Sequence, residues 1–220
     1  MQVSEHSPLA SLLPAAAATA EIIGAYAASL LPEECFALGR AAEKRRHEFA
    51  LGRACARQAI RKLGFAPTPI LRGAGREPLW PPGLCGSITH CEGYCAAVAA
   101  RQRELRCVGI DVERIQELEA GVFELIASTE ERAWITCASP WIPWGVLLFS
   151  AKESVFKAWF PIARTWLDFH DVRIEIDPCK PHFRALVRPE VPGPSNAPKQ
   201  LVGRFHLDGE RVKTSAFVLA

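Results

Sequence analysis

The sequence predicts an α/β (α+β) fold made of two successive halves that each combine helices with strands. Two segments, 41–63 and 146–160, carry apolar residues at helical spacing. Several other segments alternate apolar and polar residues with the period of a strand. Each half of the chain runs from a helix into strands, an order that is compatible with two similar α/β subdomains.

The first helix is expected over 41–63, and Gly64 gives it a stop signal. Its apolar stripe is formed by Phe49, Gly52, Ala56, Ile60 and Leu63. Arg46, Arg53 and Arg57 fall along one edge of that stripe. At such an edge an arginine either reaches over the core boundary into a cleft or extends along the surface into solvent. The spacing alone fits both possibilities.

Strands are expected in the middle of the chain, after an irregular Pro- and Gly-rich segment at 66–86. The ranges 87–90 and 94–100 flank a turn, and 107–112 alternates in the manner of a strand. Since positions i and i+2 of a strand point to the same face, Asp111 and Glu113 project side by side.

Three helices are expected next. They cover 117–126, 129–137 with a capping signal at Ser128, and 146–160, which Pro161 should end.

In the last of these helices the carboxylate of Glu153 falls inside the apolar stripe. A carboxylate there costs several kcal/mol unless it is paired or bound to a metal. The alternative is an ion pair at the helix edge with Lys157, four residues further on.

The C-terminal part of the sequence reads as strands. They are expected at 172–176, 183–187, 201–207 and 212–219. The last two join through a hairpin at Asp208 and Gly209. The four prolines between 189 and 198 indicate a mobile loop or linker.

Composition indicates one large domain or two small ones with an apolar core, because 49% of the 220 residues are hydrophobic. From 40 to 76 there are ten Lys or Arg and two Asp or Glu, whereas 111–131 holds seven Asp or Glu and one Arg. This separation suits a polyanion held together with a metal, although solvated surface charge on two helices would give the same counts.

Eight cysteines without a C-x-x-C pair predict buried thiols in a reducing compartment. An Ala-rich stretch at 9–20 follows Glu5 and His6 and lacks a basic lead-in, so a signal peptide is not expected. No apolar run is long enough to span a bilayer. We therefore expect a soluble cytoplasmic protein.

The carboxylates of Asp111, Glu113 and Glu153 form a candidate site for Mg²⁺, a cation that prefers oxygen ligands and keeps substrate phosphates in its shell. Lys157, one turn after Glu153, could donate to a leaving phosphate. The turn that ends in His90 could present hydroxyl and imidazole donors to a phosphate, although a structural histidine is also possible. A zinc site is disfavoured by poor ligand spacing, and a serine hydrolase by the lack of a nucleophile elbow.

Four blocks of sequence resemble the 4′-phosphopantetheinyl transferase superfamily, of the kind found with siderophore and polyketide synthases and most similar to its actinobacterial and enterobactin-synthase-associated members. They are K-R-R-H-E-F-A-L-G-R-A-C-A-R at 44–57, P-L-W-P-P-G-L-C-G-S-I-T-H-C at 78–91, G-I-D-V-E at 109–113 and F-S-A-K-E-S-V-F-K-A-W-F-P at 149–161. The first forty residues and the Pro-rich loop contribute nothing to it.

The resemblance implies two similar α/β subdomains, 1–105 and 106–220, in a pseudo-twofold arrangement with the active site between them. It implies transfer of phosphopantetheine from coenzyme A to a serine of an acyl or peptidyl carrier protein, with release of adenosine 3′,5′-bisphosphate. It further implies a monomer that binds neither nucleic acid nor membrane.

Carried over by residue, the resemblance places Mg²⁺ on Asp111, Glu113 and Glu153. It makes Glu153, Lys157 and His90 catalytic, with Glu153 activating the serine directly or through a water. The expected contacts of coenzyme A are Arg45, Arg53, Arg72, Ser87, Thr89, His90 and Lys157. Thr89 stands where a serine is common, and Arg72 where a lysine is often found.

Two other classes remain open. A nucleotide- or RNA-binding module could use the basic region 40–76, but few aromatic residues are interleaved with its arginines. A metal-dependent phosphohydrolase could use the same ligands and would release phosphate without a carrier protein. The acceptor carrier, and the choice between Mg²⁺ and Mn²⁺, lie beyond the sequence.

Overall fold

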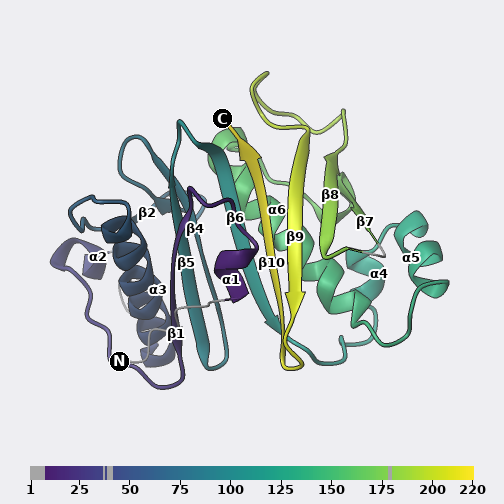
Figure 1. The fold of residues 1–220 in the computed structure, drawn as a ribbon, viewed down its shortest axis with the longest axis horizontal. Coiled ribbons are helices and arrows are strands. Elements are labelled where there is room, and N and C mark those ends of the chain that lie inside the picture. The colour runs from purple at the N-terminus through teal and green to yellow at the C-terminus, as the bar shows by residue number, and fades with distance from the viewer. Residues whose placement is uncertain (1–7, 37, 39–41, 178–179) are drawn as a thin grey trace.

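A computed structural model describes residues 8–36, 38, 42–177 and 180–220. Its two larger sheets stand side by side and form one broad β layer (Figure 1). One sheet has the strand order β1-β5-β4, and the other has the order β6-β10-β9-β8-β7. All neighbouring strands within the two sheets are antiparallel. The mixed α/β fold predicted from the sequence is confirmed.

The three-stranded sheet consists of β1 (Ala18–Ile23), β4 (Leu84–Cys91) and β5 (Tyr94–Arg101). Helix α3 (Glu43–Lys62) packs on it through small residues, which allow close approach of helix and sheet. A Cβ atom at Gly52 would lie 2.9 Å from the side chain of Ile88. Three short elements complete this half: α2 (Pro32–Phe36), β2 (Leu71–Arg72) and β3 (Pro78–Leu79).

The five-stranded sheet consists of β6 (Leu105–Arg114), β7 (Val172–Ile176), β8 (His182–Val187), β9 (Gln200–Leu207) and β10 (Arg211–Leu219). Helix α6 (Trp144–Ala163) covers it, with Trp159 fully buried. The helix lies close to β6, since a Cβ atom at Gly109 would be 1.9 Å from the carbonyl oxygen of Ser154. The helices α4 (Val122–Ile126) and α5 (Thr129–Thr136) and the 3-10 turn η1 (Phe169–Asp171) lie beside α6.

The two sheets meet along a seam between β4 and β6, which share no backbone ladder. Side-chain hydroxyls bridge it instead. The amide of Ile110 donates to Ser87 Oγ at 3.1 Å, and the amide of Val112 donates to Thr89 Oγ1 at 3.2 Å. Four buried backbone and side-chain groups are thereby satisfied where the two edge strands face each other.

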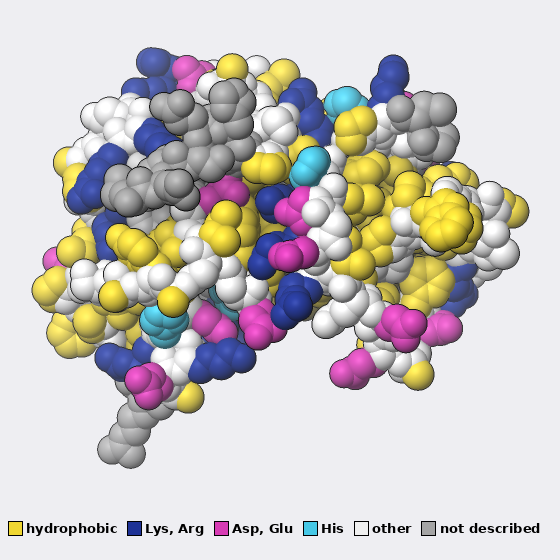
Figure 2. All heavy atoms as spheres, turned by 60° about the horizontal axis from the view of Figure 1, so that its bottom comes forward, with side chains coloured by type: hydrophobic (Ala, Val, Ile, Leu, Met, Phe, Trp, Pro, Cys, Tyr) yellow, Lys and Arg dark blue, Asp and Glu magenta, His cyan; other side chains and the backbone are white. Residues whose placement is uncertain are grey.

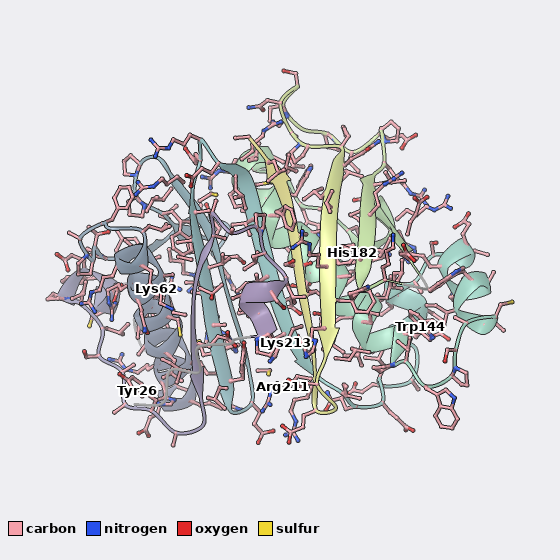
Figure 3. All side chains as sticks on the ribbon, viewed as in Figure 1. Tyr26, Lys62, Trp144, His182, Arg211 and Lys213 are labelled. Atoms are coloured by element: carbon pink, nitrogen blue, oxygen red, sulfur yellow. The ribbon has the colours of Figure 1, made fainter. Side chains whose placement is uncertain are left out.

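Cations of β10 reinforce the seam near its lower end, where Figure 3 shows Arg211 and Lys213 close to the β9–β10 hairpin. Lys213 Nζ lies 5.2 Å from the ring centre of Tyr94 on β5, and the Arg211 guanidinium lies 5.7 Å from it. Lys213 also pairs with Asp208 at 3.1 Å. Contacts between a cation and an aromatic face contribute about 0.5–2 kcal/mol each.

The N-terminal segment closes the seam on the face opposite α6. Helix α1 (Pro8–Ser11) and the residues after it bury Leu9, Leu12 and Leu13 against strands of both sheets. The hydroxyl of Ser215 on β10 donates to the carbonyl of Leu12 at 2.7 Å. Residues to which the sequence assigned no role therefore join the two halves.

Most predicted elements are confirmed within a few residues, including the capping box of Ser128 and Glu131 and the hairpin turn at Gly209. Two expectations are wrong. Helix α6 continues past Pro161 to Ala163, because a proline near the end of a helix leaves only one carbonyl without its donor. The helix expected at 117–126 forms only from Val122.

Two surface expectations also change. Among the described cysteines all seven are free, but Cys35 and Cys137 are exposed rather than buried. The Pro-rich stretch 189–198 was expected to be a mobile loop or linker, but Val191 and Ala197 are buried in it. Lys199 donates to three backbone carbonyls at the start of the stretch. Glu5, His6, Arg40, Ala41 and Cys179 lie outside the described residues.

Strands β1, β4 and β5, between 18 and 101, build one large sheet, and strands from 105 to 219 build the other, while β2 and β3 form a separate two-stranded sheet. The division into subdomains 1–105 and 106–220, and their pseudo-twofold relation, stay predictions. In the part of the chain that the structure describes, no helix combines the length and the apolar character needed to cross a membrane.

Candidate active site

The predicted carboxylates come together on the α6 side of the seam. Alternation along β6 turns Gly109 and Asp111 toward α6, where Gly109 contacts the helix and Asp111 meets Lys157. Glu153 lies one turn before Lys157 on α6. Strand and helix periodicity therefore direct side chains that are forty residues apart in sequence into one site.

Asp111 is the most deeply buried of the three carboxylates, with 2% of its surface exposed. Its Oδ1 atom accepts from Lys157 Nζ at 2.5 Å and from the hydroxyl of Thr89 at 3.2 Å. Its Oδ2 atom is buried and has no hydrogen-bond partner within the described part of the chain. An unpartnered carboxylate oxygen that water cannot reach is costly unless a cation or donor joins it.

The other carboxylates are half-buried and electrostatically crowded. Burial, followed by the charge of Asp111, raises the pKa of Glu113 to about 7. Burial also raises the pKa of Glu153, against the opposing influence of Lys157. Like charges that gather in a poorly solvated site disfavour their own ionised forms, and a bound cation reverses that preference.

Lys157 balances this negative charge. Burial is the largest single influence on its pKa and lowers it, but Asp111 and Glu153 together outweigh burial, so the pKa of Lys157 is raised. The ammonium group is therefore charged at neutral pH and can donate to an anion in the same site.

These side chains fit a divalent cation chemically, although they do not enclose one as they stand. Within the described ranges, no three His, Cys, Asp or Glu side chains are arranged to hold a metal ion. The pKa values of Glu113 and Glu153 are raised, and Asp111 has an oxygen without a partner among the described residues. The three carboxylates nevertheless provide oxygen ligands of the kind that Mg²⁺ prefers.

The predicted phosphate contacts on β4 differ in their surroundings, because two of them are buried and one is exposed. Ser87 and Thr89 are both buried and hold the seam, so their hydroxyls already have partners. Their contact with coenzyme A stays a prediction. His90 is exposed, and its pKa is lowered first by desolvation and then by Lys157 and Arg45, with Glu48 and Asp111 opposing. The imidazole is therefore influenced by charges from helix α3 as well as from the carboxylate site.

The predicted arginines form one electrostatic group around Arg53. Burial lowers the pKa of Arg53 to about 10, and the positive charges of Arg72 and Arg45 lower it further, while Glu34 opposes them. Arg53 Nε donates to the carbonyl of Ile70 at 2.9 Å, and the Arg53 guanidinium lies 3.8 Å from the ring centre of Phe49. Arg53 is therefore a structural support for the strand that carries Arg72, whereas Arg45 is exposed.

Several ion pairs that support the site were not predicted. Glu34 is fully buried, pairs with Arg57 and accepts from the amide of Ile70 at 3.0 Å. Lys152, next to Glu153, is buried with Glu131 at 2.8 Å. The sequence signal for Lys152 was its place in the K-E-x-x-x-K string, whereas nothing in the sequence pointed to Glu34.

Charged side chains also gather outside the buried site. Figure 2 shows acidic and basic groups side by side across the middle of the molecule, between apolar surfaces. Exposed ion pairs also occur near the strand ends, with Arg114 and Glu92 at 2.5 Å and Arg211 and Glu210 at 2.9 Å. Exposed pairs of this kind contribute about 0–1 kcal/mol.

A cluster of carboxylates that suits a divalent cation, together with a charged lysine and nearby arginines, can balance the charge of a phosphate ester while its bond is broken. Such a site is typical of enzymes that transfer phosphate-containing groups. Two family models match the chain: the 4′-phosphopantetheinyl transferase N-terminal domain over residues 32–100, and the 4′-phosphopantetheinyl transferase superfamily over residues 107–195.

Individual relatives agree with the family models. The 4′-phosphopantetheinyl transferase Svp of Streptomyces mobaraensis is 43% identical over 183 residues, which are 82% of this chain and 71% of the relative. The transferase PptT of Mycobacterium tuberculosis is 45% identical over 148 residues, 67% of this chain and 65% of the relative. Enterobactin synthase component D of Escherichia coli K12 is 36% identical over 124 residues, 55% of this chain and 58% of the relative. The chain belongs to the 4′-phosphopantetheinyl transferase superfamily.

Proposed function

We propose that this chain transfers the 4′-phosphopantetheine group of coenzyme A to a serine hydroxyl of an acyl or peptidyl carrier protein. The single observation that carries the proposal is Asp111. One of its oxygens accepts from Lys157, and the other is buried near Glu113 and Glu153 with no hydrogen-bond partner in the described ranges. This is the combination that a magnesium pyrophosphate requires, because it joins anionic ligands to a cationic donor.

In the reaction, the serine oxygen forms a bond to the phosphorus next to pantetheine. The bond from that phosphorus to the bridging oxygen breaks, and adenosine 3′,5′-bisphosphate leaves. Mg²⁺ bound by Asp111, Glu113 and Glu153 would supply charge neutralisation at the pyrophosphate.

The protein's own groups hold the substrate and move the proton. Lys157 and His90 donate to the phosphates, and Arg45 and Arg72 bind the 3′-phosphate of the nucleotide. Glu153, whose pKa is raised, accepts the serine proton directly or through a water. The same carboxylate can bind the metal, so one residue serves both needs.

The partners and setting follow from this proposal. Carrier proteins or carrier domains of polyketide and nonribosomal peptide synthases are the acceptors, in keeping with the enterobactin synthase component among the relatives. We infer a cytoplasmic monomer that works with coenzyme A and does not need nucleic acid or a membrane.

Intact mass of an apo carrier protein tests the proposal after incubation with this chain, coenzyme A and Mg²⁺. The expected result is a gain of one phosphopantetheine group that is lost with a chelator or in Glu153→Ala. Glu190→Ala, an exposed loop carboxylate, serves as the matched control and keeps activity. No gain with fatty acid, polyketide and nonribosomal peptide carrier proteins, or phosphate release without a carrier, would overturn the proposal.

A further inference from the structure

An ion pair ties the N-terminal half to the far end of α6. Glu77, in the loop between β2 and β3, pairs with Arg164, the residue that ends α6. Glu77 is 8% exposed, and its second oxygen, Oε2, is buried without a hydrogen-bond partner among the residues that the structure describes. Both residues line a cleft of about 190 Å³ between the halves. Since Glu77 is buried, removing Arg164 would leave a buried carboxylate without its counter-charge, which is costlier than breaking an exposed surface pair.

The loop that carries Glu77 is folded tightly onto this pair. The amide of Gly73 donates to the carbonyl of Glu77 at 2.8 Å, which closes the turn between the two strands. A Cβ atom at Gly73 would lie 2.1 Å from Glu77 Oε1, and one at Gly75 would lie 2.3 Å from the ring of Phe160 on α6. The turn can therefore hold this position only because it has glycines where it meets Glu77 and α6.

Arg72 immediately precedes this turn and pairs in register with Pro78 across β2 and β3. On its other side, the strand is held by Arg53, which donates to the carbonyls of Ile70 and, at 3.5 Å, Leu71. Fixing Glu77 therefore fixes the backbone of Arg72 from the C-terminal side, as Arg53 fixes it from the N-terminal side.

We propose that Glu77 and Arg164 are positioning residues, which hold the 72–78 loop so that Arg72 meets the nucleotide phosphate of coenzyme A. This inference rests on the proposed function for its substrate. The pair touches neither the carboxylates nor Lys157, so it acts on binding of coenzyme A and not on the chemical step.

Two variants test the ion pair between Glu77 and Arg164, which we call the clamp. Glu77→Gln keeps the shape of the buried side chain and removes its charge. Arg164→Gly removes the guanidinium at a residue whose φ of 55° lies in the left-handed region, where glycine is the least strained residue, so the helix end is preserved. Arg173→Ala, which removes an exposed pair with Glu175 at 3.6 Å on the remote strand β7, is the matched control.

The first readout is the rate of tryptic cleavage after Arg72 and Arg76, followed by mass spectrometry. The clamp predicts faster cleavage at these sites in Glu77→Gln and Arg164→Gly but not in Arg173→Ala. This readout needs neither coenzyme A nor a carrier protein, so it reports on the clamp even if the chain transfers nothing. Unchanged cleavage in both variants would overturn the clamp.

The second readout is the KM for coenzyme A, together with the Kd for coenzyme A measured by calorimetry. We expect both to rise about tenfold, the loss that accompanies one charge-assisted contact, with kcat and the KM for the carrier within about twofold of wild type. Faster cleavage with an unchanged KM and Kd would show a clamp without a role in binding. An equal fall of kcat in both variants would show general loss of structure. Either outcome overturns the positioning role.

Discussion

Asp111, Glu113, Glu153 and Lys157 could be predicted as a group because each sits in a short string whose periodicity fixes its direction. The D-x-E alternation of β6 and the i, i+4 spacing on α6 needed only local structure. The contact between Asp111 and Lys157 at 2.5 Å depends on packing between β6 and α6. No local sequence pattern indicates that packing. Ser87 and Thr89, which lie on strand β4 and not in a turn, show the limit of such reasoning, since a hydroxyl serves equally well for a phosphate or for the backbone.

Glu113 should make the effect of Mg²⁺ on stability depend on pH. Its pKa of about 7 lies above the ordinary carboxyl value, so between that value and 7 the folded state binds more protons than the unfolded state. The contribution of this group to stability is therefore lost as the pH rises through that window. Mg²⁺ binds the ionised carboxylate, so its stabilising effect should increase with pH.

Thermal unfolding at about pH 6 and about pH 8, with and without Mg²⁺, measures this linkage. The rise in Tm caused by Mg²⁺ should be larger at the higher pH, with about 2–4 °C corresponding to each kcal/mol. In Glu113→Gln the difference between the two pH values should shrink. An equal rise at both pH values in wild type would contradict the assignment of Glu113 as a ligand.

At the scale of elements, Lys152 is the centre of a buried network that sets the orientation of α6. Its ammonium donates to Glu131, to the carbonyl of Ile126 and to the carbonyl of Phe169, each at 2.8 Å. Glu131 in turn accepts from the amide of Ile174 at 2.8 Å and caps α5. Helix α6 is thereby attached to four neighbouring segments one residue before Glu153.

Lys152→Met should lower the free energy of unfolding by about 3–5 kcal/mol, because Glu131 would remain buried without its counter-charge. Urea unfolding measures this as a lower midpoint with an unchanged m value. Arg132→Ala removes an exposed neighbour on α5, whose contact with Thr129 is 3.4 Å, and should change stability by less than about 0.5 kcal/mol. A loss below about 1 kcal/mol in Lys152→Met would contradict the network.

Helix α6 also shows why element boundaries were harder to predict than element types. A proline breaks a helix because it lacks a hydrogen-bond donor and its ring clashes with the preceding turn. Pro161 lies in the last turn of α6, where little of the helix remains to be broken. The helix ends instead at Arg164, whose conformation no sequence rule identified. The short strand β1 was missed because an Ala-rich stretch has no alternation of polarity to reveal its pairing with β5.

On the scale of the whole molecule, the chain joins its halves with a segment that the sequence left unassigned. Leu9, Leu12 and Leu13 are buried against strands that belong to both sheets. Three leucines among alanines carry no periodic signal over so short a stretch, so their role could only be seen once the two sheets were placed together. Long-range packing of this kind is the part of a fold that local patterns cannot supply.

Leu12→Ala should therefore destabilise the entire protein and not only its N-terminus, by about 2–5 kcal/mol. Chemical unfolding followed by tryptophan fluorescence, which reports mainly on the C-terminal half, should detect the loss. Leu125→Ala, at a leucine that is 68% exposed, is the control and should be nearly neutral. An unchanged tryptophan transition in Leu12→Ala would mean that the halves unfold independently.

The hydroxyl bridges between β4 and β6 have one more consequence. The amide protons of Ile110 and Val112 are shielded by two rotatable side chains and not by a neighbouring backbone. If the sheets separate slightly to admit a large nucleotide, these two protons exchange with deuterated solvent while the β6–β10 ladder stays protected. Isotope exchange at two positions would then record each opening of the molecule, and bound coenzyme A would slow it.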